Sequence, residues 1–262
     1  MRRKYREKIY KCGDYMDIHL YPVYKMNGKR KAKYKETNEY QKRLNDKNSA
    51  NALSRLINLN FTENDYALHL TYAQENLPAS PEEAQKNIQN FIRRLKRVYK
   101  KQGAELKYIH VTEKGEQSDR VHHHLIISGG VDRTTIENVW NLGYANTRTL
   151  QFNKSGCIGL ATYVTKQKLL YRHFTPSKNL KRPEATERTG KITQKQLDYW
   201  KNFIDLNGLE EEIKNQYPGY SLCEIPEIIE NDVNGGLYSY IRLIKTQKLC
   251  DIEKKKPKRI SS

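Results

Sequence analysis

The chain has 262 residues, of which 48 are lysine or arginine and 30 are aspartate or glutamate, so its formal charge is +18 with neutral histidines. No segment approaches the ~18 consecutive apolar residues that a spanning helix needs, and the mean hydropathy is −0.92, so we expect no membrane insertion. A chain of this length can bury a sizeable core without staples. The excess of basic residues favours a polyanionic partner, nucleic acid first, because each cation that neutralises a phosphate releases condensed counterions.

The four cysteines are widely scattered and form no Cys-x-x-Cys pair; they are Cys12, Cys157, Cys223 and Cys250. This spacing predicts reduced thiols and an intracellular protein. The basic start at residues 1–6 is not followed by an apolar segment, so we expect no secretion signal.

The first 52 residues are basic and rich in tyrosine, and they show no sustained apolar periodicity. We predict that residues 1–52 form a basic N-terminal arm without a core, with its densest charge at 29–35. A solvated extension and an arm that contacts phosphates explain this composition equally well. The apolar residues from Leu53 to Leu59 recur at near-helical spacing and predict a short helix that enters the core.

The next 130 or so residues alternate between strand and helix signals. Ser80 followed by Pro81 and two acids is a strong helix start, because it combines a cap, a first-turn proline and a favourable dipole interaction. The expected elements are strands at 66–72, 106–113, 121–127 and 145–152 and helices at 81–102, 134–140 and 158–170. Their order predicts an α+β fold with a central antiparallel sheet flanked by helices.

Residues 53–183 therefore form the predicted core, and residues 184–262 form a C-terminal α/β extension. The extension is indicated by a helical stripe over 193–206 and a strand over 236–244. Its basic end, at 253–259, is expected to be unstructured. The sequence does not indicate what the region after Pro183 does.

Two histidines, His122 and His124, are expected on the same face of one strand, while His123 points to the other face as a packed or hydrogen-bonded residue. A lone His-x-His more often decorates a strand edge than it binds a metal. If the preceding strand pairs antiparallel, Glu113 can add a carboxylate from the same face. Three ligands with open positions left over describe a catalytic metal site. Glu116 and Asp119 are alternative third ligands.

A helix follows in which Tyr163 and Lys166 are three residues apart and share one face. A phenol ordinarily titrates near ~10, so it needs a nearby cation or a polarised electrophile to act as a nucleophile at neutral pH. In a chain with 19 tyrosines, however, a Tyr-x-x-Lys pair usually means packing beside a solvated cation.

In order, the segments Leu70-Thr71-Tyr72, His122-His123-His124 and Tyr163-Val164-Thr165-Lys166 resemble the motifs of the HUH endonuclease superfamily. The likeness is greatest to rolling-circle replication initiators of single-stranded DNA phages and related plasmids, and it runs from about Asn58 to Pro183. It implies an HUH endonuclease-like fold.

Carried over to this chain, the resemblance makes His122 and His124 metal ligands and Glu113 the third ligand, for Mg²⁺ or Mn²⁺. It makes Tyr163 the nucleophile, with Lys166 orienting or neutralising the scissile phosphate. Two positions depart from the usual pattern: His123 stands where an apolar residue is usual, and Gln167 stands where some relatives have a second tyrosine. A single-tyrosine enzyme is implied.

The implied activity is nicking and rejoining of single-stranded origin DNA, free or in a hairpin, through a 5′-phosphotyrosine that releases a 3′-OH primer. No phosphate-binding Gly-x-x-x-x-Gly-Lys-Ser/Thr loop is found, and the nearest match is Thr189-Gly190-Lys191. We therefore expect a separate helicase and polymerase, in the cytoplasm of a bacterium that carries a phage or another mobile element.

Three other interpretations remain open. Within the superfamily the chain could be a transposase or a relaxase, although relaxases usually place the tyrosine before the histidine motif. It could also be a non-catalytic basic protein that binds nucleic acid. A metal-dependent hydrolase that uses activated water would keep the histidine site but not need Tyr163.

Overall fold

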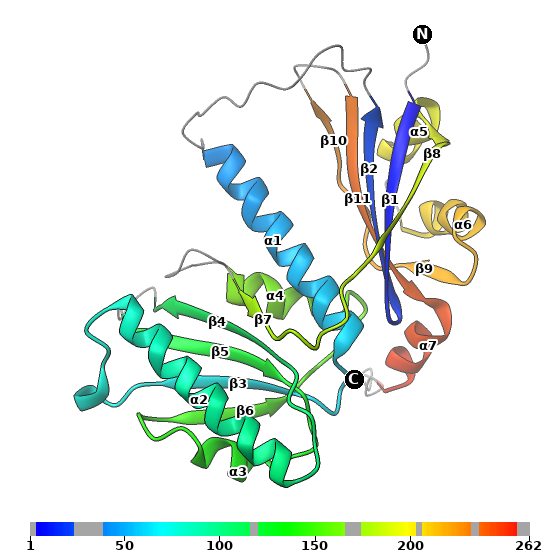
Figure 1. Cartoon of the computed structure of the whole chain (residues 1–262). Coiled ribbons are helices and arrows are strands. Elements are labelled where there is room, and N and C mark those ends of the chain that lie inside the picture. Colours follow the sequence, from blue (N-terminus) through cyan, green and yellow to red (C-terminus); the bar gives the residue numbers. More distant parts are fainter. Residues whose placement is uncertain are drawn as a thin grey trace, which may run out of the picture. The chain divides into compact units, whose positions relative to one another are not determined.

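The computed structural model describes residues 4–23, 39–115, 120–165, 174–202, 206–231 and 236–255 (Figure 1). The chain divides into two compact units. Unit 1 comprises Met1–Thr37, Asn153–Gly156 and Arg182–Ser262, and unit 2 comprises Asn38–Phe152 and Cys157–Lys181. None of the helices in the described ranges is long and apolar enough to cross a membrane.

Unit 2 is built on a five-stranded antiparallel sheet in the order β6-β3-β5-β4-β7. Its strands are β3 (Tyr66–Thr71), β4 (Tyr108–Lys114), β5 (Val121–Ile127), β6 (Ala145–Thr149) and β7 (Thr175–Pro176). Its helices are α1 (Glu39–Asn60), α2 (Pro81–Lys101), α3 (Arg133–Asn138) and α4 (Ile158–Thr165), with a short 3₁₀ turn, η1 (Gln74–Asn76). The predicted α+β fold with an antiparallel sheet between helices is confirmed.

The two faces of this sheet pack against different helices. On one face, α2 and α3 contribute Ile88, Phe91 and Ile136 to a core that also contains Leu68 and Leu125. On the other face, α1 and α4 contribute a second core; its buried members include Leu53, Ile57, Ala161, Val164, Ile109 and Ile126. The second face also carries the polar residues of interest, so α1 and α4 decide how open it is.

Two helix starts differ from the expected ones. The helix α3 begins one residue earlier than expected, because Asp132 and not a threonine is the cap: its carboxylate accepts a hydrogen bond from the Thr135 amide at 2.9 Å. The helix α1 begins at Glu39, well before Leu53. Most of its large buried apolar side chains lie in its C-terminal part, so apolar spacing detects that part only. The Ser80 cap of α2 is as predicted, with its hydroxyl accepting from the Glu83 amide.

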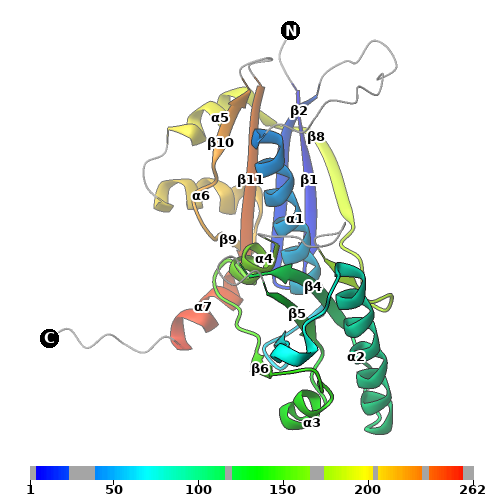
Figure 2. The ribbon, with the colours of Figure 1, turned by 90° about the vertical axis from the view of Figure 1, so that its left-hand side faces the viewer.

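Unit 1 contains a six-stranded antiparallel sheet in the order β10-β11-β2-β1-β8, with β9 paired to β11. Its strands are β1 (Lys4–Cys12), β2 (Tyr15–Val23), β8 (Ala185–Thr193), β9 (Tyr220–Leu222), β10 (Ile228–Asn231) and β11 (Gly236–Lys245). Its helices are α5 (Gln194–Lys201), α6 (Leu206–Gln216) and α7 (Thr246–Lys255). The helices α5 and α6 lie on one side of the sheet and pack into its core (Figure 2).

The prediction of an N-terminal arm without a core is wrong for residues 4–23. These residues form the β1–β2 hairpin at the centre of the unit 1 sheet, paired on one side with β8 and on the other with β11. The core-facing positions of β1 include Tyr5 and Glu7, and Glu7 is fully buried beside Arg188, with which it forms an ion pair. Because an ionised residue and a tyrosine occupy inward positions, the strand lacks the aliphatic alternation that would reveal it. The segment 29–35 lies outside the described residues.

The C-terminal residues also differ from the expected separate extension, since β8 and β11 complete the same sheet as the N-terminal hairpin. The helix α7 continues to Lys255, so the first residues of the expected unstructured end are helical. Residues 256–259 lie outside the described ranges.

The buried imidazole of His110, on β4, makes unit 2 sensitive to acid. Burial lowers its pKa to about 4, whereas an imidazole in the unfolded chain titrates near ~6.5. Between these values the unfolded state binds more protons, so stability falls as the pH drops from about 6.5 towards 4, by up to roughly 2 kcal/mol at pH 5. We expect His110→Met to show a smaller decrease in Tm between pH 7 and pH 5 than the wild type. An equal decrease in both proteins would contradict this assignment.

Gly143 allows the backbone after α3 to lie directly against the end of β3. A Cβ atom at this position would lie 2.5 Å from the Ala73 amide nitrogen and closer still to the Thr71 carbonyl oxygen. These backbone groups are held by hydrogen bonds, such as Ala73 N to Leu142 O at 2.8 Å. We expect Gly143→Ala to destabilise unit 2 by about 2–3 kcal/mol in chemical denaturation. The matched control, Gly159→Ala in α4, has open space around its new methyl group and should stabilise by about 0.5–1 kcal/mol. Equal effects would refute the steric argument.

Candidate active site

The register of three neighbouring strands gathers one carboxylate and three imidazoles on the α1/α4 face of unit 2. On β5, His122 lies opposite Glu113 of β4, and His124 lies opposite His69 of β3. Paired residues of an antiparallel sheet point to the same face. The structure therefore brings together His122, His124 and Glu113, as strand alternation predicts, and adds His69.

Glu113 bridges the two histidines of β5. Its Oε1 accepts hydrogen bonds from Nε2 of His122 and from Nε2 of His124, each at 2.9 Å. Burial opposes ionisation of Glu113, but the hydrogen bonds from both imidazoles outweigh it and lower the pKa of this carboxyl to about 2. Burial also disfavours the charged form of His122, yet its hydrogen bond with Glu113 leaves its pKa raised. Glu113 is thus an anion at neutral pH, held between two donors.

His69 is the functional candidate that the sequence analysis did not identify. One ring nitrogen from each of His69, His122 and His124 lies within 4.8 Å of the others. The His69 ring stacks on that of His124, with 4.6 Å between centroids. Burial, and then the neighbouring His124 and His122, lower the pKa of His69 to about 4, so its imidazole is neutral at pH 7. Its place on the outer face of the first strand was visible in the sequence; its pairing with the histidine strand was not.

This donor set fits a divalent cation. Among the described residues, Nε2 of His69 is a buried nitrogen without a hydrogen-bond partner. Neutral imidazoles and an ionised carboxylate are the forms that ligate metals. The roles of His122, His124 and Glu113 as ligands stay predictions, as does that of His69. The alternative ligands Glu116 and Asp119 lie outside the described residues.

His123 points to the opposite face, as predicted, and is fully buried there. Its two ring nitrogens make hydrogen bonds of 2.8 Å, Nε2 with the Tyr72 hydroxyl and Nδ1 with Thr112 Oγ1. Burial lowers its pKa to about 3, so it stays neutral. An imidazole fits where an apolar residue is usual because both of its nitrogens are satisfied inside the α2 face of the sheet.

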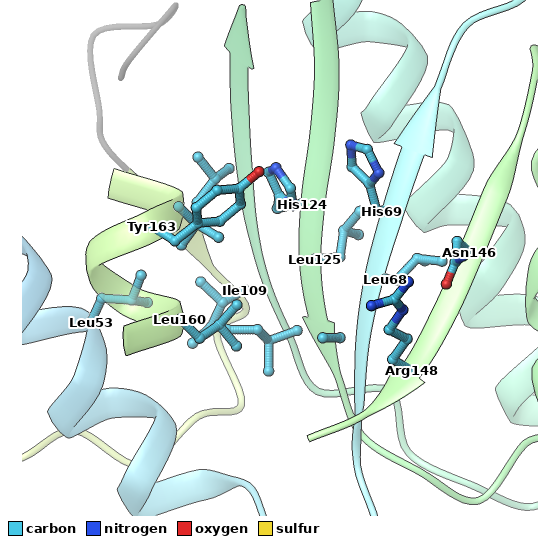
Figure 3. A pocket seen from close by; sticks show the side chains of 14 residues that line it. Leu53, Leu68, His69, Ile109, His124, Leu125, Asn146, Arg148, Leu160 and Tyr163 are labelled. Carbon is cyan, nitrogen blue, oxygen red and sulfur yellow. The ribbon is translucent and has the colours of Figure 1, made fainter. Parts of the chain in front are cut away.

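Tyr163 reaches the imidazole cluster from α4. The helix is fixed by the buried side chains of Ala161 and Val164, while Tyr163 remains 61% exposed. Its ring meets that of His124 edge to face, with 5.5 Å between centroids. Figure 3 shows its hydroxyl directed towards His124. The predicted partner Lys166 lies outside the described residues.

A pocket of about 320 Å³ opens between the sheet and the helices α1 and α4 (Figure 3). Tyr163, His124 and His69 line one part of it, and Asn146 and Arg148 of β6 line another. The remaining lining residues are mostly aliphatic and include Leu53, Ala67, Ile109, Val111, Ile126, Leu160 and Val164. The aromatic hydroxyl and the imidazoles thus share one cavity that is large enough for a small ligand group.

Comparison with known proteins supports the same segment. Residues 65–168 match the model of a family described as Replication-associated protein, of the ORF2 and gene II protein type. No curated protein and no solved structure matches the chain. The matched segment runs from the start of β3 beyond the end of α4 and contains the three clustered imidazoles and Tyr163. The resemblance to rolling-circle replication initiators is therefore confirmed, and residues 65–168 belong to this replication-associated protein family of such initiators.

Proposed function

We propose that this chain starts rolling-circle replication by nicking and rejoining single-stranded origin DNA through a covalent phosphotyrosine at Tyr163. The observation that carries the proposal is the position of this exposed phenol, whose ring lies 5.5 Å from that of His124 at one shared pocket. A tyrosine beside a cluster of metal-binding type is suited to nucleophilic attack on a phosphodiester. An initiator family supplies the biological setting.

The chemical step balances within the substrate and the protein. Tyr163 Oη attacks phosphorus in line, loses its proton as the O–P bond forms, and displaces the 3′ oxygen, which leaves as a 3′-OH after taking up a proton. The DNA strand remains attached through a 5′-phosphotyrosine. Because one phosphodiester replaces another, the 3′-OH can attack in reverse and rejoin the strand without ATP.

Glu113, His122, His124 and His69 would hold a divalent cation, Mg²⁺ or Mn²⁺. When bound, it would supply electrostatic stabilisation of the negative charge that develops on the phosphate. The chain's own contribution is to keep these ligands oriented: Glu113 stays ionised between two imidazoles, and His69 stays neutral. Lys166 would neutralise the scissile phosphate from the next turn of the tyrosine helix.

The free 3′-OH would be extended by a separate polymerase, with a separate helicase opening the duplex. The only near match to a nucleotide-binding loop, at 189–191, lies inside the strand β8 and not in a loop that opens a helix. We infer that the partner DNA is single-stranded origin DNA, free or in a hairpin, in the cytoplasm of a bacterium carrying a phage or related element.

The test is adduct formation on a pool of randomised single-stranded oligonucleotides with a label at the 3′ end. The label is placed there because a 5′-phosphotyrosine keeps the 3′ fragment on the protein. With Mn²⁺ we expect a labelled band that survives denaturation and disappears with chelator. Cleavage without an adduct would favour a water-activating hydrolase, and binding with neither product would favour a non-catalytic nucleic-acid binder.

The donor set also predicts which cation works best. Mg²⁺ prefers oxygen ligands and keeps its waters, whereas imidazoles bind later first-row metals and Mn²⁺ more readily. With three imidazoles in the cluster, we expect half-maximal adduct formation at roughly tenfold lower Mn²⁺ than Mg²⁺. Titration of each metal in the adduct assay measures this, and a lower requirement for Mg²⁺ would contradict ligation by all three imidazoles.

A further inference from the structure

The pocket beside Tyr163 extends past the imidazole cluster to the edge strand β6, where it has a different chemical character. Asn146 lies opposite His69 in the β3–β6 register, and Arg148 lies opposite Ala67, so both face the pocket side of the sheet. Figure 3 shows the side chain of Arg148 extending from β6 into the pocket. Nothing in the nicking step described above uses this end of the cavity.

The walls at this end suit a flat apolar group. Ile109 and Ile126 of the sheet and Leu160 of α4 line the pocket. Ala67 occupies the position between Ile126 and Arg148 in the strand order. Because Ala67 has only a methyl group and remains partly exposed, the cavity continues over it. A larger residue here would fill the space.

The polar edge of the pocket presents hydrogen-bond donors. Arg148 is exposed, and no carboxylate partner for it is found among the described residues. A guanidinium offers two parallel N–H groups that match the O6 and N7 acceptors of guanine, and an amide such as that of Asn146 both donates and accepts. An aliphatic slot closed by such groups is the kind of site that holds a base turned out of its strand.

We propose that this pocket holds the base of a nucleotide next to the scissile phosphate and that Arg148 makes guanine the preferred base. The inference rests on the proposed function, since the base is placed by the strand that Tyr163 attacks. A base bound in the pocket would fix the neighbouring phosphate beside Tyr163. Arg148 would therefore act as a specificity-determining residue, separate from the imidazole cluster and the nucleophile.

The test is sequencing of the DNA recovered from adducts formed on the randomised pool. For the wild type we expect guanine at one position next to the cut, favoured on the order of 10- to 100-fold over other bases. Arg148→Gln should relax this position alone, while it still forms adducts at Tyr163. The matched control is Arg93→Gln on α2, which covers the other face of the sheet; it should keep the wild-type preference.

A second variant tests the space itself. Ala67→Val retains strand propensity but narrows the slot, and we expect it to slow adduct formation at the preferred sequence about tenfold while the melting temperature of the protein stays close to the wild-type value. An unchanged base preference in Arg148→Gln would overturn the inference, as would an equal loss on all sequences, which would assign Arg148 to a phosphate. Failure of the wild type to form any adduct would instead contradict the proposed function, and with it the inference.

Discussion

Replacing Tyr163 with phenylalanine should abolish the covalent protein–DNA adduct and reduce strand cleavage by at least about 10³-fold, because the nucleophile itself is lost. The phenyl ring can keep its edge-to-face contact with His124, since only the hydroxyl is removed. The fold and the affinity for single-stranded DNA should therefore remain within about twofold of the wild type. The measurements are denaturing electrophoresis for the adduct and fluorescence anisotropy for binding.

The control for this substitution is Tyr144→Phe, in the segment before β6. Tyr144 is 65% exposed, similar to Tyr163, but it does not line the pocket. We expect Tyr144→Phe to form adducts at the wild-type rate. Wild-type cleavage by Tyr163→Phe would identify the chain as a hydrolase that activates water, and the phosphotyrosine mechanism would have to be abandoned.

The second large effect is expected at the imidazole cluster. We expect His124→Ala to lower adduct formation by at least about 100-fold, because His124 contacts Glu113, His69 and Tyr163 at once. His69→Ala should weaken Mn²⁺ binding about 10- to 100-fold in isothermal titration calorimetry, and added Mn²⁺ should partly restore its activity. The readout of metal affinity separates a ligand from a residue that only packs.

The matched control for loss of an imidazole is His110→Met. His110 lies on β4 opposite Leu125, on the face of the sheet that packs against α2, away from the cluster. We expect this variant to bind Mn²⁺ as the wild type does. If His69→Ala also bound Mn²⁺ with unchanged affinity, the metal would be held by Glu113 and the β5 histidines without His69.

Much of the candidate site can be predicted from the sequence because strand alternation is a local property. It places His122 and His124 on one face, separates them from His123, and makes Glu113 available on a neighbouring strand. The antiparallel pairing that the prediction required is present, with Glu113 directly opposite His122. The tyrosine helix is likewise visible, although its expected end at residue 170 falls outside the described residues.

What sequence reasoning missed depends on long-range pairing or on unusual inward residues. His69 joins the cluster only because β3 lies beside β5, more than 50 residues later in the chain. The β1–β2 hairpin was missed because β1 buries Glu7 in an ion pair with Arg188, a partner far along the chain. In both cases the deciding contact is non-local, so no periodicity within the segment reports it.

The most direct test of the central claim is to find the amino acid that carries the DNA. The adduct is formed with Mn²⁺, digested with protease and nuclease, and analysed by tandem mass spectrometry for a peptide with a nucleotide on tyrosine. We predict modification of Tyr163 alone among the 19 tyrosines of the chain. A nucleotide on another tyrosine, or on a residue other than tyrosine, would contradict the assignment of Tyr163 as the nucleophile.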